Sequence, residues 1–223
     1  MSIREWVEDP KDSGTLLRRI RLVVLLDSAE KAGLVPLSVL RLHSLAFLSN
    51  VLAPVWNMQA LDGKILKRRG GPFYPELQHD LDRLVGMGVV VVSNLSHVRD
   101  EDQRWRLEGS FRLHREYASG ILDCIKQYET ERLVGTFLQE LAYALSALDD
   151  DDLDRITTKD ATYSDPVVSV GNVIDFAEWR NVNYSANAAR HFERLLPNGS
   201  HATPGEMLHL YARHLHTRLI GGH

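Results

Sequence analysis

The sequence lacks several features that would assign it to a class at once. Its 223 residues include one cysteine, Cys124, which excludes an internal disulfide framework and a cysteine-rich zinc site. No run approaches the roughly 18 uninterrupted apolar residues of a membrane span, and the first ten residues hold no apolar core of a secretory signal. We therefore expect a cytoplasmic protein with no membrane partner.

An excess of basic charge is also missing. Lys and Arg number 26 against 30 Asp and Glu, so the formal net charge is −4. A chain with this balance is not a general binder of polyanions, and any contact with nucleic acid must be local. Apolar residues make up 44% and charged residues 25%, which is typical of a globular chain with a sizeable core.

Common catalytic signatures are absent as well. The sequence has no glycine-rich phosphate loop, no G-x-S-x-G elbow and no H-E-x-x-H pair. We therefore expect no enzyme, no cofactor and no metal. One enzymatic alternative stays open, in which the carboxylates of residues 149–154 meet Asp175 and Glu178 in the fold and support a metal-dependent reaction.

Apolar spacing predicts a mainly helical chain. Helices are expected over residues 16–32, 37–52 and 75–86, followed by strands over 89–92 and 105–113 with a polar loop between them. This order is typical of a winged helix-turn-helix with a short two-stranded wing. Further helices are expected over 113–125 and 133–145, and another after the capping box at Thr203.

The predicted organisation has two parts. Residues 13–112 form the winged-helix domain, and residues 113–223 form a helical C-terminal region with an irregular segment around 149–180. The acidic run at 149–154 reads as a solvated linker or helix end, since its carboxylates repel one another unless a cation neutralises them.

Basic residues gather between the second and third expected helices and around the wing. Such residues can contact phosphates, which supply most of the sequence-independent affinity for DNA. The DNA-binding candidates are Lys64, Lys67, Arg68, Arg69, Arg83, His97, Arg99 and Arg104.

The third expected helix argues for protein contact instead. Its predicted exposed face carries Glu76, Asp80 and Asp82, and a base-reading helix among phosphates should not hold three carboxylates. We therefore favour a winged helix used mainly to bind protein. The candidate interface residues are Glu76, His79, Asp80, Asp82, Phe137 and Leu141.

One block of sequence carries a family resemblance. The stretch from Arg41-Leu42-His43 to Asn50, followed by the stretch from Arg69-Gly-Gly-Pro-Phe-Tyr-Pro to Gly88-Val-Val, resembles the middle component of three-component ABC-ATPase conflict systems. Lamassu-type bacterial defence systems belong to that group. The likeness covers residues 37–111 and rests on no catalytic residue.

The resemblance implies a non-catalytic accessory subunit of an SMC-like ABC ATPase. Such a subunit links the ATPase to an effector, for example a nuclease, and helps the complex to sense invading double-stranded DNA. A stand-alone winged-helix transcription regulator is the main alternative, in which the helices after the wing dimerise the protein on a palindromic site.

Overall fold

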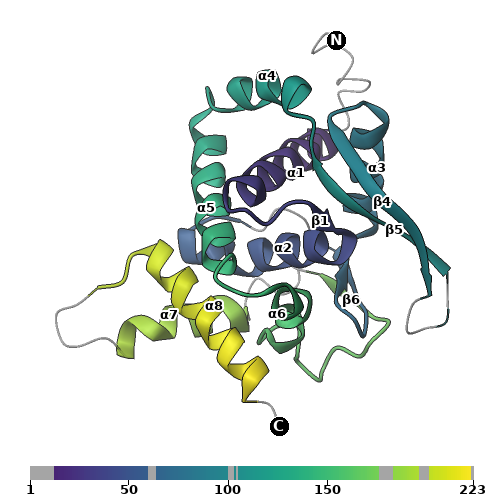
Figure 1. The fold of residues 1–223 in the computed structure, drawn as a ribbon. Helices are drawn as coiled ribbons and strands as arrows, with labels where there is room; N and C mark the ends of the chain where they lie inside the picture. The colour runs from purple at the N-terminus through teal and green to yellow at the C-terminus, as the bar shows by residue number, and fades with distance from the viewer. Residues whose placement is uncertain are drawn as a thin grey trace.

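The computed structural model describes residues 13–59, 64–99, 103, 105–175, 183–195 and 201–221. It is mostly helical, with 61% helix and 16% strand, so the predicted mainly α class is confirmed. Figure 1 shows α2 near the centre, α1 and α4 on one side of it, and a long hairpin, β4–β5, projecting at the edge.

The elements follow one another in an order that begins helix, strand, helix. Their bounds are α1 Ser13–Lys31, β1 Leu37–Ser38, α2 Val39–Leu52, η3 Ala53–Trp56, β2 Lys64–Lys67, β3 Pro72–Phe73, α3 Pro75–Gly86, β4 Val90–Arg99, β5 Trp105–Leu113, α4 Arg115–Ile125, α5 Glu129–Leu145, α6 Asp150–Arg155, η4 Ile156–Lys159, β6 Val173–Asp175, α7 Tyr184–His191, η6 Phe192–Leu195 and α8 Pro204–Ile220.

Two predicted helix starts are confirmed in detail. Helix α3 begins with Pro75 in the first turn, where a missing N–H costs nothing. Helix α8 begins with a complete capping box, in which Thr203 Oγ1 accepts from the backbone N–H of Glu206 and the Glu206 carboxylate accepts from the N–H of Thr203 at 2.7 Å.

The first sheet is antiparallel and has the strand order β1-β5-β4. Leu37 of β1 and Val92 of β4 both lie opposite Phe111 of β5, so the short strand before α2 is tied to the hairpin that follows α3. The hairpin is longer than predicted, because residues 93–99 extend β4 although most of them are polar. Cross-strand hydrogen bonds to β5 hold these exposed residues in the sheet.

A second sheet, β3-β2-β6, occupies the segment that the sequence analysis treated as a basic loop. Leu66 pairs with Phe73 on one side and with Val173 on the other. The expected irregular segment around 149–180 therefore contributes a strand, as well as α6 and η4. Strands of two to four residues are too short to show a period, which is why the pattern did not predict them.

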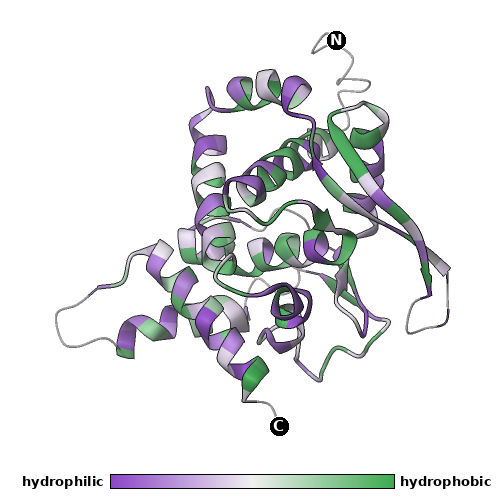
Figure 2. Cartoon of the chain, in the orientation of Figure 1, coloured by the Kyte–Doolittle hydropathy of each residue, from purple (hydrophilic) through white to green (hydrophobic). Residues whose placement is uncertain are grey.

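Helix α2 lies at the centre of the core. Leu42, Phe47 and Val51 are fully buried, and Figure 2 shows hydrophobic residues interspersed with hydrophilic ones along this helix. The stretch Val39–Trp56 is long and apolar enough to cross a membrane by length and composition, and 72% of it is buried inside the fold. Residues from both predicted domains, such as Leu26 and Phe137, belong to one hydrophobic cluster.

Candidate functional site

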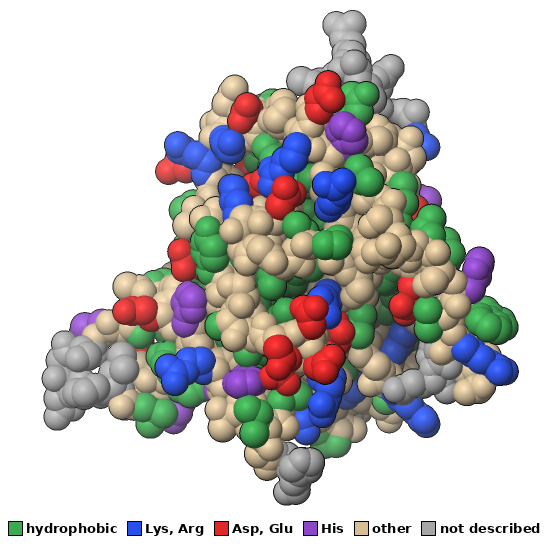
Figure 3. All heavy atoms as spheres, viewed as in Figure 1, with side chains coloured by type: hydrophobic (Ala, Val, Ile, Leu, Met, Phe, Trp, Pro, Cys, Tyr) green, Lys and Arg blue, Asp and Glu red, His purple; other side chains and the backbone are tan. Residues whose placement is uncertain are grey.

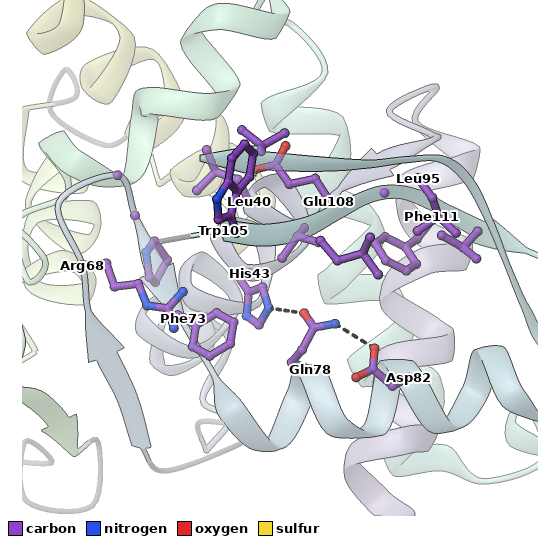
Figure 4. A pocket seen from close by; sticks show the side chains of 18 of the residues that line it. Leu40, His43, Arg68, Phe73, Gln78, Asp82, Leu95, Trp105, Glu108 and Phe111 are labelled. Carbon is purple, nitrogen blue, oxygen red and sulfur yellow. Dashed lines mark hydrogen bonds between the residues drawn. The ribbon is translucent and has the colours of Figure 1, made fainter. Parts of the chain in front are cut away.

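A groove with a volume of about 880 Å³ separates the β4–β5 hairpin from the body of the protein. One wall is the face of the hairpin, and the opposite wall comes from α2, α3 and the turn between β2 and β3. Figure 4 shows Trp105, Leu95 and Phe111 on the hairpin side, and Arg68, Phe73, Gln78 and Asp82 on the other side.

The hairpin wall is apolar and open to solvent. Trp105, Leu107 and Leu95 are 69%, 59% and 57% exposed. Gly109 shapes this wall, because a Cβ atom there would lie 2.8 Å from Val92 Cγ2 and 3.1 Å from Leu95 Cδ2. Glycine thus lets two neighbouring side chains of β4 pack over the strand. Large apolar side chains exposed together are typical of a surface that binds a partner.

A hydrogen-bonded chain stiffens the opposite wall. The backbone N–H of Tyr74 donates to His43 Nδ1 at 3.1 Å, so the ring proton is on Nε2 and donates to Gln78 Oε1 at 3.1 Å. Gln78 Nε2 in turn donates to Asp82 Oδ1 at 2.9 Å. The chain fixes the first turns of α3 against α2 and orients Asp82 at the groove.

His43 is neutral in this arrangement. Burial lowers its pKa to about 4, because the apolar surroundings disfavour the charged ring; the nearby Arg68 adds to this, and the bond to Gln78 opposes it. The ring also packs against Phe73 in a tilted arrangement, with centroids 4.8 Å apart and an interplanar angle of 35°. His43 is not among the functional residues that the sequence pattern indicates, and the structure gives it a positioning role at the base of the groove.

Some of the predicted DNA-binding cations are engaged within the protein. Lys67 is buried, with its Nζ donating to the Asp165 carbonyl at 2.8 Å, and burial lowers its pKa. Lys64 is exposed but lies 3.6 Å from Asp175 on the neighbouring strand β6. The Arg68 guanidinium stacks over the Phe73 ring at 3.5 Å. These three residues do not form one open basic patch.

The other cations are more accessible. Arg69 lies in the β2–β3 turn, and Arg83 is on α3, while His97 and Arg99 are on β4; all four are exposed. Arg69 and Arg99 line the groove. Arg104 lies outside the described residues. The described DNA-binding candidates therefore do not share one surface. Arg68, Arg69 and Arg99 line the groove, whereas Arg83 is on α3, His97 is elsewhere on β4, and Lys64 and Lys67 are on β2.

The candidate interface residues also divide into two groups. Glu76, His79 and Asp82 are exposed on α3, as predicted. Asp80 is instead fully buried and binds Arg18 and Arg19 of α1, the second at 2.8 Å.

Phe137 and Leu141 are buried in the core of this chain, at 1% exposure each. Because α5 packs these side chains against the protein's own helices, they and Asp80 are removed from the surface that a partner can reach.

Part of the acidic run has partners within the chain. Arg41 on α2 binds Asp154 at 2.7 Å and Asp150 at 2.9 Å, and His216 on α8 lies 2.8 Å from Asp152. Figure 3 shows acidic side chains gathered over α6 with basic side chains beside them. These ion pairs explain how closely spaced carboxylates are accommodated at the start of a helix.

The enzymatic alternative requires the carboxylates of residues 149–154 to lie close to Asp175 and Glu178. Among the residues that the structure describes, these carboxylates do not form one group. Asp175 lies on β6 beside Lys64, away from the cations that bind residues 150–154, and Glu178 lies outside the described residues. In the described ranges, no three His, Cys, Asp or Glu residues form a group that could hold a metal ion.

A buried carboxylate that the sequence analysis missed organises the C-terminal region. Asp160 accepts from the backbone N–H groups of Thr162 and Tyr163, from Ser185 Oγ at 2.8 Å and from Tyr211 Oη at 2.7 Å. Burial raises its pKa, and the four donors oppose that rise. These bonds tie the segment after η4 to α7 and α8. A lone Asp in a polar stretch gave no signal of this role.

Comparisons with protein-family models, with curated proteins and with solved structures find no match to this chain.

Proposed function

We propose that this chain is a winged-helix accessory subunit that binds other proteins through its hairpin groove. The order α1, β1, α2, α3, β4, β5 with the sheet order β1-β5-β4 supports the winged-helix assignment. In that assignment α2 and α3 form the helix-turn-helix, and β4–β5 is the wing.

The observation that carries the proposal is the apolar face of the wing. A wing that lies along DNA presents cations to phosphates, whereas this one presents Leu95, Trp105 and Leu107 to solvent. Helix α3, in the position of a recognition helix, exposes Glu76 and Asp82. Both elements are therefore better suited to a protein surface than to a DNA groove.

The partner assignment rests on the family resemblance. We propose an SMC-like ABC ATPase as the main partner and an effector, such as a nuclease, as the second, in a cytoplasmic defence complex against phage or plasmids. In this complex the subunit is non-catalytic, and double-stranded DNA is reached through the assembly. The exposed cations Arg69, Arg83, His97 and Arg99 are then the remaining residues for an auxiliary DNA contact.

Co-purification tests the proposal. The chain is expressed with its neighbouring genes, captured through an N-terminal tag and washed at high salt, and the retained proteins are identified by mass spectrometry. A stoichiometric SMC-like ATPase is the expected result. A homodimer that retains no other protein and shifts one specific DNA sequence would refute the proposal and favour the transcription regulator.

A further inference from the structure

We infer that the hairpin groove binds an acidic, amphipathic peptide segment of the partner protein. Its apolar side chains would lie against β5 and β4, and its carboxylates against the arginines at the mouth of the groove. This inference deepens the proposed function, on which it rests, because it states how the accessory subunit holds its partner.

The shape and surface of the groove suit a short segment of chain. Leu40 and Phe73 of the body line it together with the hairpin residues Trp105, Leu107 and Leu95. None of the described residues covers Trp105 or Leu107, as their exposure shows. An occupant with large apolar side chains would remove both walls from water at once, which is the main source of affinity in peptide grooves.

The charged residues that line the groove favour an occupant with negative charge. Three arginines line it, Arg68, Arg69 and Arg99, against two carboxylates, Asp82 and Glu108. The groove is thus positive although the whole chain carries −4. Within the described parts of the chain, Arg69 has no ion-pair partner, and Arg99 makes one long hydrogen bond, 3.4 Å to the Gln103 carbonyl.

The groove is also polarised along its length. In Figure 4 Arg68 lies at one end, and Asp82 lies at the other end beyond His43 and Gln78. The Gln78 bond holds Asp82 in place, so its negative charge is fixed at that end. The occupant should therefore place its carboxylates at the arginine end and keep them away from Asp82.

A nucleic-acid strand fits this surface less well than a peptide. Phosphates repeat along a strand and would meet Glu108 and Asp82 as well as the arginines. Stacking with successive bases requires several exposed planar side chains. Among the described lining residues Trp105 is the one largely exposed aromatic, and Leu95, Val98 and Leu107 beside it are aliphatic.

Selection from random peptides of about 12 residues tests the inference and does not require the partner to be identified first. The full chain is immobilised, and enriched peptides are sequenced and their affinities measured. Two groove variants are tested, Leu107→Ser and the pair Arg69→Glu with Arg99→Glu. The controls are the same kinds of substitution outside the groove, Leu133→Ser on α5 and Arg213→Glu on α8. All five side chains are exposed, so none of the substitutions opens the core.

The expected result is a set of peptides with Leu, Phe or Trp next to Asp or Glu. Each groove variant should weaken their binding by about tenfold or more, a change of about 1.4 kcal/mol, and the controls should not. The loss from the arginine variant should shrink as salt screens the charges.

Several outcomes would overturn the inference. These are no enrichment, enriched peptides without carboxylates, equal losses in the control variants, and displacement of the peptides by an oligothymidine strand. Co-purification of the ATPase with the groove variants at the wild-type level would also overturn it, together with the groove as the partner-binding surface, and would leave only the accessory role itself standing. Loss of the ATPase from the wild-type chain would instead count against the proposed function.

Discussion

Because His43 is neutral in the folded chain, the free energy of unfolding depends on pH. In the folded chain its pKa is lowered to about 4 from 6.5, so between these values the unfolded chain binds a proton that the folded chain does not. The free energy of unfolding must therefore fall as the pH falls through this window. About one pH unit above 6.5 and higher, the ring is almost entirely neutral in both states and contributes little pH dependence.

The size of the effect follows from the two pKa values. A difference of about 2.5 units corresponds to about 3 kcal/mol when fully developed. Between about pH 7.5 and about pH 5, only part of it is expressed, about 2 kcal/mol. This is a large fraction of the stability of a typical domain.

Denaturant unfolding of wild type and His43→Gln at both pH values measures this contribution. The variant keeps a polar side chain without a titrating ring, and all other groups titrate in both proteins. The difference in unfolding free energy between them should change by about 2 kcal/mol from neutral to acid pH. Parallel pH profiles would refute the assignment; His43→Asn, which can still accept from the Tyr74 N–H, repeats the test if the first variant does not fold.

Three further predictions concern residues that hold the fold, each measured by chemical denaturation at neutral pH. Asp80→Ala should destabilise by about 3 kcal/mol, since it leaves Arg18 without its buried carboxylate; a loss below about 1 kcal/mol, typical of an exposed ion pair, would contradict this. Asp160→Asn should cost about 1–3 kcal/mol because an amide cannot accept from all four donors, and unchanged stability would show that the network is dispensable. Gly71→Ala should also destabilise, as Gly71 has φ +148° and a Cβ would lie 2.6 Å from Leu40 Cδ1; a neutral result would show that this turn relaxes freely.

Local patterns predicted the longer helices and strand β5 well, but they did not predict α6 or α7 and ended β4 at residue 92. The starts of α3 and α8 follow from proline and capping residues, and the alternation from Trp105 to Leu113 matches β5. These features depend on neighbours within a few residues, and such short-range preferences are visible in one sequence.

Long-range partners were not predictable in the same way. Asp80 was placed on an exposed helix face, but it is buried by Arg18, 62 residues earlier. Lys67 was expected to contact DNA, but it reaches a carbonyl 98 residues later. In both cases the local pattern is compatible with exposure, and the packing of a distant segment decides the outcome.

The groove was only partly visible from sequence. The exposed acidic residues of α3 and the basic residues of the β2–β3 turn were selected as separate candidates. The hairpin brings Leu95 of β4 and Trp105 and Leu107 of β5 to the same groove as Arg69 and Asp82. The alternation of apolar residues in β5 indicated a strand, but it did not indicate which face of the strand stays uncovered. That face depends on how the hairpin leans over α2 and α3, which no periodicity encodes.

Hydrogen exchange on the co-purified complex decides whether the partner occupies the groove. Amide exchange in the chain alone is compared with exchange in the complex with its partner. We expect new protection along β4 and β5 and in the β2–β3 turn, because the partner fills the groove between them. Protection confined to α4, α5 and the C-terminal helices, with the hairpin unchanged, would contradict the proposed binding mode.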